Sequence, residues 1–320
     1  MTSDPTVTVG EDTSTVSYLT EAVTTGLPVT TDPIAPDPVF AIILGLWNLV
    51  GLLFNLIIAI TFILSSKLKT PANVFVINLA IADCAIFMTS IPAVVSVYTG
   101  WGRDMFSDFT CHLYPVCAAL ASFSSVCFIG AIGFTRYIYI CGPQKQVTWL
   151  VWKKCLIGAC FIWCLNIGLA FFGLSDYVAV QYHEKLFMCA FDFGENPVFI
   201  VVLLGATYIS SAVVMTFSYI QILVKVRKHV KMVHPMSQSS IAKTELRLAV
   251  QIFIIYVVYN LCWGTVSSLT VLDPQFDLPI FIYKLFIFLI FISSFINFPI
   301  YLYFNRTFRE EVCRLWLCWS

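Results

Sequence analysis

Seven long apolar segments, separated by short polar stretches, form the dominant pattern of this 320-residue chain. A helix needs about 20 largely apolar residues to cross roughly 30 Å of hydrocarbon. Continuous apolar runs favour helices over the alternating strands of a membrane barrel. The pattern therefore predicts an all-α membrane protein, a bundle of seven transmembrane helices at about residues 39–64, 73–98, 109–140, 152–174, 197–224, 246–272 and 281–304.

Composition agrees with this pattern and argues against a nucleic-acid-binding protein. Hydrophobic residues make up 59% of the chain and charged residues 11%. A soluble domain has about 45–50% apolar residues and about 25% charged residues. The 18 basic and 18 acidic residues balance to a net charge of zero. A protein that binds nucleic acid carries a basic excess instead.

The basic residues predict the orientation, because cytoplasmic loops are enriched in Lys and Arg. With the N-terminus outside, all basic residues except Arg103, Lys185 and Lys284 fall on the cytoplasmic side. We therefore predict a multi-pass plasma-membrane protein with an extracellular N-terminus and a cytoplasmic C-terminus. The outer face is acidic, which serves either solubility or the attraction of a cationic ligand.

Two segments flank the bundle, which occupies residues 39–304. Residues 1–38 are rich in Thr, Ser and Pro, which predicts a disordered extracellular tail. The connections between the predicted spans are short, so any function belongs to the bundle and its loops.

The C-terminal segment, residues 305–320, has the pattern of an amphipathic helix lying on the inner leaflet. Its apolar stripe consists of Phe308, Val312, Leu315 and Trp319. Cys313 and Cys318 are candidates for palmitoylation, with two unmodified thiols as the alternative.

Polar residues within the spans indicate a function or a partner, because an Asp or Arg at mid-membrane costs roughly 2.5–3.5 kcal/mol. Asp83 lies near the middle of the second span. Polar residues of other spans can converge beside it, namely Asn55, Ser122, Ser124, Ser125, Ser293, Ser294 and Asn297. Taken alone, this cluster is either a polar core or a site for a small cation.

Arg136 lies at the cytoplasmic end of the third span, where an arginine needs a partner in a closed bundle. The nearest available acid is Glu245, at the inner end of the sixth span. A pair between them would tie these spans together, and its rupture would let them separate. This is the kind of bistable element that a switch requires.

Most of the 12 cysteines fall within the spans as small apolar residues. Cys111, at the start of the third span, and Cys189, in the second outer loop, are expected on the oxidising outer face. A disulfide between them would hold that loop over the mouth of the bundle.

The order of these residues resembles that of rhodopsin-like (class A) G-protein-coupled receptors. The resemblance covers about residues 39–313, and the segments Asn73–Asp83 and Arg136–Cys141 are most similar to melatonin receptors and related invertebrate orphan receptors. The matching positions are Asn55, Leu79, Ala80, Ala82, Asp83, Trp101, Cys111, Arg136, Tyr137, Trp163, Cys189, Tyr219, Cys262, Trp263, Asn297, Tyr301, Phe308 and Arg309.

Four positions depart from the pattern of the class. Thr135 replaces the acid that usually precedes the arginine, and Pro299 comes one place late in the seventh span. Ser211 and Thr265 replace the usual prolines of the fifth and sixth spans. Since proline kinks a helix, we expect these two spans to be straighter than usual.

The resemblance implies a ligand pocket between spans three, five, six and seven. The positions that hold the ligand in melatonin receptors are Gly173 and Phe193 here, so this part of the site is altered. An aminergic salt bridge is not expected, because the third span lacks the required Asp. An opsin is not expected either, because the retinal-binding Lys is replaced by Phe291. The expected pocket residues are Ala118, Phe191, Trp263 and Phe291.

The resemblance also implies a signalling receptor, not an enzyme, that transmits binding of an extracellular small molecule or peptide to a heterotrimeric G protein. Arrestin and membrane lipids are further expected partners. No cofactor is expected beyond a sodium ion as allosteric modulator, held by Asp83, Ser125, Ser293 and Asn297. The expected switch and G-protein-coupling residues are Arg136, Tyr137, Tyr219, Glu245, Trp263 and Tyr301.

Three alternatives differ in class or ligand. An orphan peptide or lipid receptor of the same class would share all these motifs. A transporter would need paired intramembrane charges, often in repeated halves, but the chain has one mid-membrane acid and no repeat. An enzyme would need converging catalytic groups, but the four histidines lie at loops or span ends.

Overall fold

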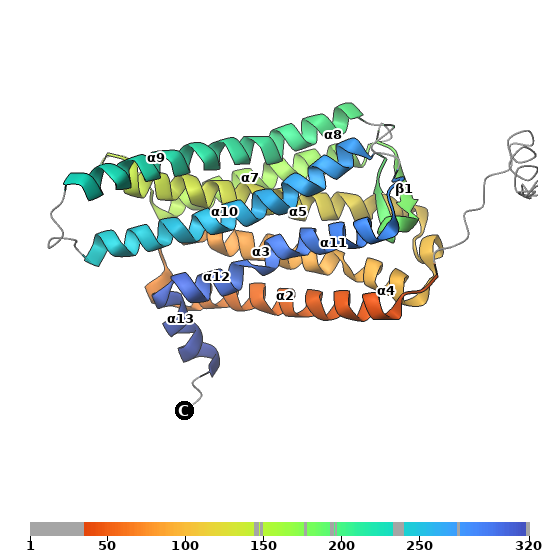
Figure 1. Cartoon of the computed structure of the whole chain (residues 1–320), viewed down its shortest axis with the longest axis horizontal. Helices are drawn as coiled ribbons and strands as arrows, with labels where there is room; N and C mark the ends of the chain where they lie inside the picture. The colour runs from red at the N-terminus through yellow and green to blue at the C-terminus, as the bar shows by residue number, and fades with distance from the viewer. Residues whose placement is uncertain are drawn as a thin grey trace, which may run out of the picture. The chain divides into compact units, whose positions relative to one another are not determined.

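The computed structural model describes residues 35–143, 147, 150–175, 178–192, 195, 197–232, 240–273 and 276–317. Nearly all of the predicted tail lies outside these residues, as do Phe193, Cys318 and Trp319. The described chain forms a bundle of long helices with a two-stranded hairpin at one end (Figure 1).

The helices of the bundle coincide with the predicted spans to within a few residues at most of their ends. By length and composition, five spans in the described chain can cross a membrane, and the other two contain the apolar segments Ser210–Lys225 and Phe253–Leu269. The predicted all-α membrane bundle is therefore confirmed. The spans are α2 (Pro38–Leu64), α3 (Asn73–Thr89) with α4 (Ile91–Thr99), α5 (Asp108–Cys141), α7 (Trp152–Gly173), α8 (Pro197–Leu204) with α9 (Ser210–Met232), α10 (Ser240–Leu272), and α11 (Ile280–Phe295) with α12 (Asn297–Phe304).

Two helices continue well beyond their predicted ends. Helix α9 runs on past residue 224, and α10 begins before residue 246. The continuation of α9 carries Lys225, Arg227 and Lys228, and such straight-chain residues favour a helix in water as well as in lipid. The apolar pattern ends at the membrane surface and does not indicate these extensions.

Two spans are broken near a proline, which lacks the backbone N–H needed to continue a helix. Helix α3 gives way to α4 at Ser90, two residues before Pro92. Helix α11 gives way to α12 at Ile296, three residues before Pro299. The second break lies between Ser294 and Asn297, two residues of the polar centre described below.

The two spans that lack the usual proline differ from each other. Helix α10, which contains Thr265, runs unbroken from Ser240 to Leu272. In the fifth span a π-helical turn, η4 (Gly205–Ile209), separates α8 from α9 just before Ser211. An irregular turn is therefore present in the fifth span although Ser211 replaces the usual proline, so this span is not straighter as expected.

A close contact sets the distance between α2 and α3. A Cβ atom at Gly51 would lie 2.3 Å from the ring of Phe87, so no larger residue fits there without a shift of the ring. The Phe87 ring in turn stacks on Phe291 of α11, with ring centroids 5.7 Å apart. Gly51 therefore helps to place an aromatic residue of the predicted ligand pocket.

The hairpin covers one end of the bundle, which we call the hairpin end. Strand β1 (Val180–His183) pairs antiparallel with β2 (Met188–Phe191), and the 3-10 turn η3 (Glu184–Leu186) connects them. Cys189 of β2 forms a disulfide with Cys111 of α5, with their Cα atoms 5.3 Å apart. The predicted disulfide is thus confirmed, and it ties the hairpin to the third span.

The opposite end, which we call the α13 end, carries helix α13 (Arg306–Val312) and the π-helical turn η6 (Cys313–Leu317). Helix α13 turns away from the long axis of the bundle (Figure 1). As predicted, it is amphipathic: Phe308 and Val312 are buried, and Leu315 is half-buried. Cys313 is a half-buried free thiol. Glu311 is also buried, although the apolar stripe does not include it.

Candidate functional site

The centre of the bundle contains a fully buried carboxylate, Asp83 of α3. Its Oδ1 atom accepts hydrogen bonds from Ser125 Oγ at 2.7 Å and Ser294 Oγ at 2.9 Å. Its Oδ2 atom accepts a hydrogen bond from Asn297 Nδ2 at 2.7 Å. The carboxylate therefore joins the second, third and seventh spans at mid-bundle.

The neighbouring serine, Ser293, has a different partner. Its hydroxyl accepts a hydrogen bond from Trp263 Nε1 at 3.1 Å and donates one to the Ile290 carbonyl at 2.8 Å. The sequence suggested Ser293 as a neighbour of Asp83, but the hydrogen bond to the carboxylate comes from Ser294. The sequence placed both serines in the polar cluster and assigned Ser293 to the sodium site. Adjacent helical residues point about 100° apart, so the two serines face different neighbours.

Three more buried side-chain oxygens, on residues of this cluster or beside it, have no hydrogen-bond partner among the described residues. They are the side-chain oxygens Asn55 Oδ1, Ser124 Oγ and Asn297 Oδ1. Since an unpaired buried polar atom costs about 1–3 kcal/mol, such atoms indicate water or an ion. Hard cations prefer oxygen ligands, so the donor set around Asp83 fits a small cation such as sodium.

A second region, toward the hairpin end, contains the predicted pocket residues. Trp263 of α10 is buried and stacks on Tyr259, with ring centroids 5.9 Å apart. Phe191 of β2 is buried against Phe199 of α8, with ring centroids 5.4 Å apart. Ala118 of α5 is half-buried. With Phe291 on α11, these residues give this part of the bundle an apolar, largely aromatic character.

Gly173, the last residue of α7, lies directly beside the ring of Phe191. A Cβ atom at Gly173 would lie 3.4 Å from the Phe191 ring and 3.5 Å from Val116 Cγ2. A polar side chain at residue 173 would therefore extend into the space that Phe191 and its neighbours now fill. The absence of a side chain at Gly173 therefore leaves room for the Phe191 ring beside the end of α7.

Ion pairs and hydrogen bonds close the hairpin end around this region. Lys185 of η3 donates to the carbonyls of Phe276 and Leu278 at 2.5 and 2.9 Å. Lys284 of α11 pairs with Asp37 at 2.5 Å. The hydrogen bond from Lys284 lowers the pKa of Asp37, the residue that caps the N-terminus of α2. These contacts thus connect the start of the first span to the seventh span, and the hairpin turn η3 to the loop that contains Phe276 and Leu278.

At the other end of α5, the predicted switch arginine has no adjacent acid. Thr135 is buried, and its hydroxyl donates to the Ile132 carbonyl of its own helix at 2.8 Å. Arg136 Nε is buried and has no partner among the described residues. The side chain of Glu245 lies outside the described residues, so the proposed pair with Arg136 stays a prediction.

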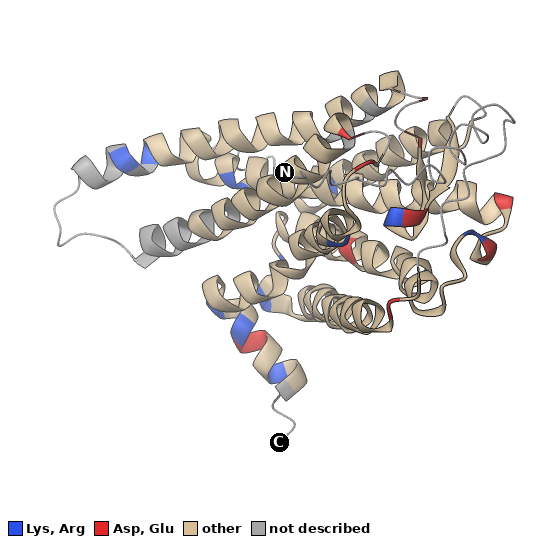
Figure 2. Ribbon diagram, turned by 45° about the vertical axis from the view of Figure 1, so that its right-hand side comes forward, with Lys and Arg blue, Asp and Glu red and all other residues tan. Residues whose placement is uncertain are grey.

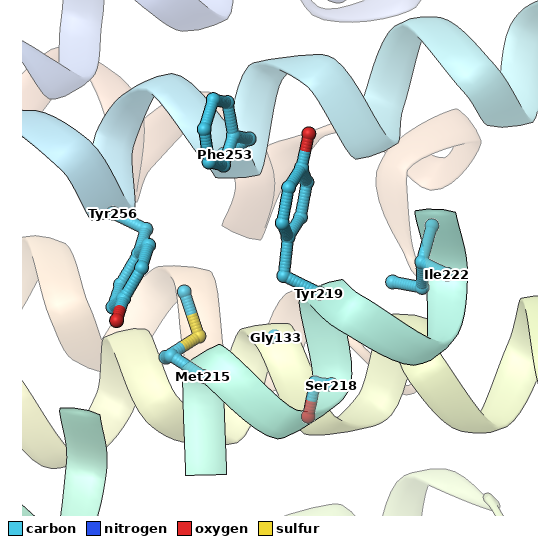
Figure 3. Close-up of a pocket in the computed structure, with 7 residues that line it drawn as sticks. All are labelled: Gly133, Met215, Ser218, Tyr219, Ile222, Phe253 and Tyr256. Atoms are coloured by element: carbon cyan, nitrogen blue, oxygen red, sulfur yellow. The ribbon is translucent and has the colours of Figure 1, made fainter. Parts of the chain in front are cut away.

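The predicted coupling residue Tyr219 belongs to a pocket between α5, α9 and α10 (Figure 3). Its ring stacks on Phe253 of α10, with centroids 4.0 Å apart and the planes 13° from parallel. A Cβ atom at Gly133 of α5 would overlap Met215 Sδ, so a larger residue there would force the Met215 side chain to shift. The stack joins the fifth and sixth spans at this pocket.

The other two coupling candidates, Tyr137 and Tyr301, pack against aromatic rings outside this pocket. Tyr137 of α5 meets Phe217 of α9 edge-on, with ring centroids 5.4 Å apart. Tyr301 of α12 is buried and packs against Phe62 of α2 and Phe308 of α13. Tyr219 and Tyr301 therefore have separate aromatic partners in this arrangement.

This fold and these sites define a seven-helix membrane receptor. The chain belongs to the rhodopsin family of seven-transmembrane receptors, since residues 54–301 match the family described as 7 transmembrane receptor (rhodopsin family). The resemblance inferred from the sequence is thereby confirmed.

Within the family, the chain is similar to melatonin receptors. It is 26% identical to melatonin receptor type 1B-B of Danio rerio over 285 residues, which cover 87% of this chain and 81% of that protein. It is 25% identical to melatonin receptor type 1A of Mus musculus over 279 residues, which cover 85% and 78%. Its fold matches the crystal structure of squid rhodopsin with a TM-score of 0.77 at 21% identity, covering 88% of this chain and 85% of that one.

Proposed function

We propose that this receptor transmits the binding of an extracellular ligand at the hairpin end to a heterotrimeric G protein at the α13 end. The N-terminus would be extracellular. The distribution of charge supports this orientation: described Lys and Arg residues gather toward the α13 end, and most described acidic residues lie toward the hairpin end (Figure 2). A disulfide at the hairpin end fits an oxidising exterior.

The ligand would be a small neutral molecule, related in chemistry to melatonin. The relatives named above are melatonin receptors, and the predicted pocket residues are apolar. Gly173 contacts Phe191, so this ligand would rely on ring contacts where the melatonin pattern has a polar residue. A peptide or lipid ligand is the alternative within the same class.

The observation that carries the proposal is a chain of contacts from the floor of the pocket to the buried carboxylate. Trp263 bonds Ser293, and the next residue, Ser294, bonds Asp83. Asp83 also bonds Asn297, which lies one turn before Tyr301. A ligand that moves the indole would therefore disturb the seventh span as far as the G-protein side.

The energetic requirement is that the ligand binds the open arrangement more tightly than the closed one. About 5.5 kcal/mol of differential binding moves a two-state equilibrium from 1:99 to 99:1. In the open state Arg136 would leave Glu245 and, with Tyr219 and Tyr301, line a cavity for the G protein. Separation of Tyr219 from Phe253 is a step that this transition would require.

Asp83, Ser125, Ser294 and Asn297 would hold a sodium ion that favours the closed arrangement. The support is the buried carboxylate with its convergent oxygens and the unpartnered Asn55 and Asn297 oxygens. Arrestin and membrane lipids are the other expected partners, and Cys313 at the membrane surface is a candidate for acylation. The receptor would have no enzymatic activity of its own.

The test is guanine-nucleotide exchange by purified heterotrimeric G proteins in vesicles containing the full chain, with melatonin, other indoleamines and peptides as probes. We expect at least one probe to accelerate exchange in the wild type. Arg136→Ala should abolish this response while surface expression in cells is preserved. Full coupling by Arg136→Ala would contradict the switch, and solute flux without any G protein would favour a transporter.

A further inference from the structure

A cavity lies between the end of α7 and the first turns of α8. Its volume is about 340 Å³, which is within the range of about 300–1,000 Å³ that is typical of ligand pockets. All but one of its lining residues are apolar, and the exception is a glutamate. We call this cavity the α7–α8 groove, and its lining residues are Phe172, Val178, Glu195, Pro197, Val198, Phe199 and Val202.

The floor of the groove adjoins the predicted ligand pocket without being part of it. Phe199 and Val178 are buried. The ring centroid of Phe199 lies 5.5 Å from that of Phe172 and 5.4 Å from that of Phe191. Phe191 is a predicted pocket residue, but it does not line the groove. The groove is therefore a separate site that shares the Phe199 ring with that region.

The rim of the groove consists of apolar side chains on two membrane-spanning segments. Phe172 of α7 and the two valines of α8, Val198 and Val202, are exposed on the outside of the bundle. Val202 lies five residues after Pro197, which is about 7.5 Å further into the membrane at 1.5 Å per residue. In a bilayer these side chains meet lipid, so an apolar group can enter the groove from the membrane without crossing water.

The end of the groove at the membrane surface is acidic. Glu195 is exposed and lies two residues before the start of α8. Its backbone N–H donates to Asp192 Oδ1 at 3.2 Å, which places a second carboxylate in the same turn. Asp192 Oδ2 accepts a hydrogen bond from Gln181 at 2.6 Å. None of the ion pairs among the described residues involves Glu195.

The chain around the groove adds to this negative charge. Residues 174–198 contain four acids and a single lysine. That lysine, Lys185, donates to the carbonyls of Phe276 and Leu278 on another loop. Since opposite charges attract and like charges repel, Glu195 favours a cationic headgroup over a neutral one and disfavours the anionic phosphate of a phospholipid.

We propose that the α7–α8 groove binds a cationic amphiphile from the membrane, a lipid-like molecule with one apolar chain and an amine headgroup. The chain would lie against Phe172, Phe199 and Val202, and the ammonium would pair with the Glu195 carboxylate. This orientation keeps the charge at the membrane surface and the chain in hydrocarbon. The inference goes beyond the proposed function, because it depends neither on a G protein nor on which side of the membrane the hairpin end faces.

The experiment is competition photolabelling of the full chain in nanodiscs of phosphatidylcholine. The probe is dodecylamine with a diazirine in its chain, and mass spectrometry identifies the labelled peptides. The competitors are dodecylamine, dodecanol and dodecanoate, which have similar chains and different headgroups, at equal mole fractions in the bilayer. We expect labelling at residues 172 and 197–202. Dodecylamine should compete about fivefold better than dodecanol, the upper end for an exposed ion pair, and dodecanoate should compete least.

Glu195→Gln tests the ion pair. This variant should lose the preference for the amine and keep the competition by dodecanol, which also shows that the groove is still folded. The matched control is Asp104→Asn, which removes another exposed acid at the hairpin end, on the 3-10 turn η2 (Gly102–Met105) and outside the groove. The control should keep the preference for the amine.

Val202→Trp tests the apolar part of the site. The larger side chain should fill the groove and abolish specific labelling by the probe. Its matched control is Val213→Trp, because Val213 is an equally exposed valine on α9 that does not line the groove. Labelling of the groove should be unchanged in this control.

Four results would overturn the proposal. Equal competition by dodecanol and dodecylamine in the wild type would show that the groove does not recognise a cation. A preference for the amine that persists in Glu195→Gln, or that is lost equally in Asp104→Asn, would exclude the ion pair. Labelling spread evenly over the lipid-facing helices would mean that the groove is not a specific site. Cholesterol that competes as well as dodecylamine would make the groove a sterol site instead.

Discussion

The adjacent serines 293 and 294 make the proposed sodium site testable without any ligand. Ser294 hydrogen-bonds to Asp83, whereas Ser293 hydrogen-bonds to Trp263. If Asp83 holds sodium, removal of the Ser294 hydroxyl should weaken sodium binding, and removal of the Ser293 hydroxyl should not. The variants are Ser294→Ala, Ser293→Ala and Asp83→Asn.

The expected magnitude follows from linkage. A ligand that binds only the folded state stabilises it by RT ln(1 + [L]/Kd), which is about 1.4 kcal/mol when sodium is at ten times its Kd. A change of 1 kcal/mol moves the unfolding temperature of a mid-sized domain by about 2–4 °C. Sodium should therefore raise the unfolding temperature of the wild type by about 3 °C.

The assay is thermal unfolding of the purified receptor in sodium chloride, compared with choline chloride at the same ionic strength. Asp83→Asn should abolish the sodium-specific increase, because the carboxylate charge is lost while the side-chain shape is kept. Ser294→Ala should reduce the increase, since one oxygen of the cluster is removed. Ser293→Ala should leave it intact, although this variant loses the hydrogen bond to Trp263.

Two results would refute this reasoning. A sodium-specific increase that persists in Asp83→Asn would place the ion elsewhere in the receptor. Equal losses in the two serine variants would mean that the hydrogen bond to Asp83 does not distinguish their roles.

Three further predictions concern the switch and the hairpin end. Glu245→Ala should raise basal nucleotide exchange, and unchanged exchange would mean that Arg136 does not pair with it. Thr135→Asp should lower basal exchange, because it puts a carboxylate beside an arginine whose Nε has no described partner; an increase would contradict this. Burial lowers the pKa of His183, whose ring centroid is 4.2 Å from that of Phe276. The unfolded state therefore takes up a proton first, so stability should fall as the pH drops below about 6.5. His183→Gln should flatten the dependence of the unfolding temperature on pH between 7.5 and 5.5. An unchanged slope would mean that another group causes the pH dependence.

Most of the spans and the disulfide could be predicted from the sequence, because both follow from local chemistry. A segment crossing lipid must satisfy its own backbone hydrogen bonds, so each apolar run becomes a helix. Cys111 and Cys189 pair as expected. The ends of α9 and α10 were predicted less well, since charged helix formers continue these helices outside the apolar pattern.

The details of the polar centre required the tertiary structure. The sequence placed Asp83, Ser125 and Asn297 together, and both Ser125 and Asn297 hydrogen-bond to Asp83. It did not distinguish Ser293 from Ser294, because the answer depends on how α11 is rotated before its break at Ile296. Packing against neighbouring helices sets this rotation.

The sequence by itself determined the membrane class, the approximate course of the helices and the receptor family, because apolar length and a few spaced motifs specify them. Other contacts between distant side chains were decided only by the tertiary structure. Glu311 looks like an ordinary surface acid in the sequence, yet it is buried and joins α13 to the end of α2. Its partner Lys67 is 244 positions earlier in the chain, and no local pattern brings such distant charges together. Their contact exists because Phe308 packs against the first span and carries the acid with it.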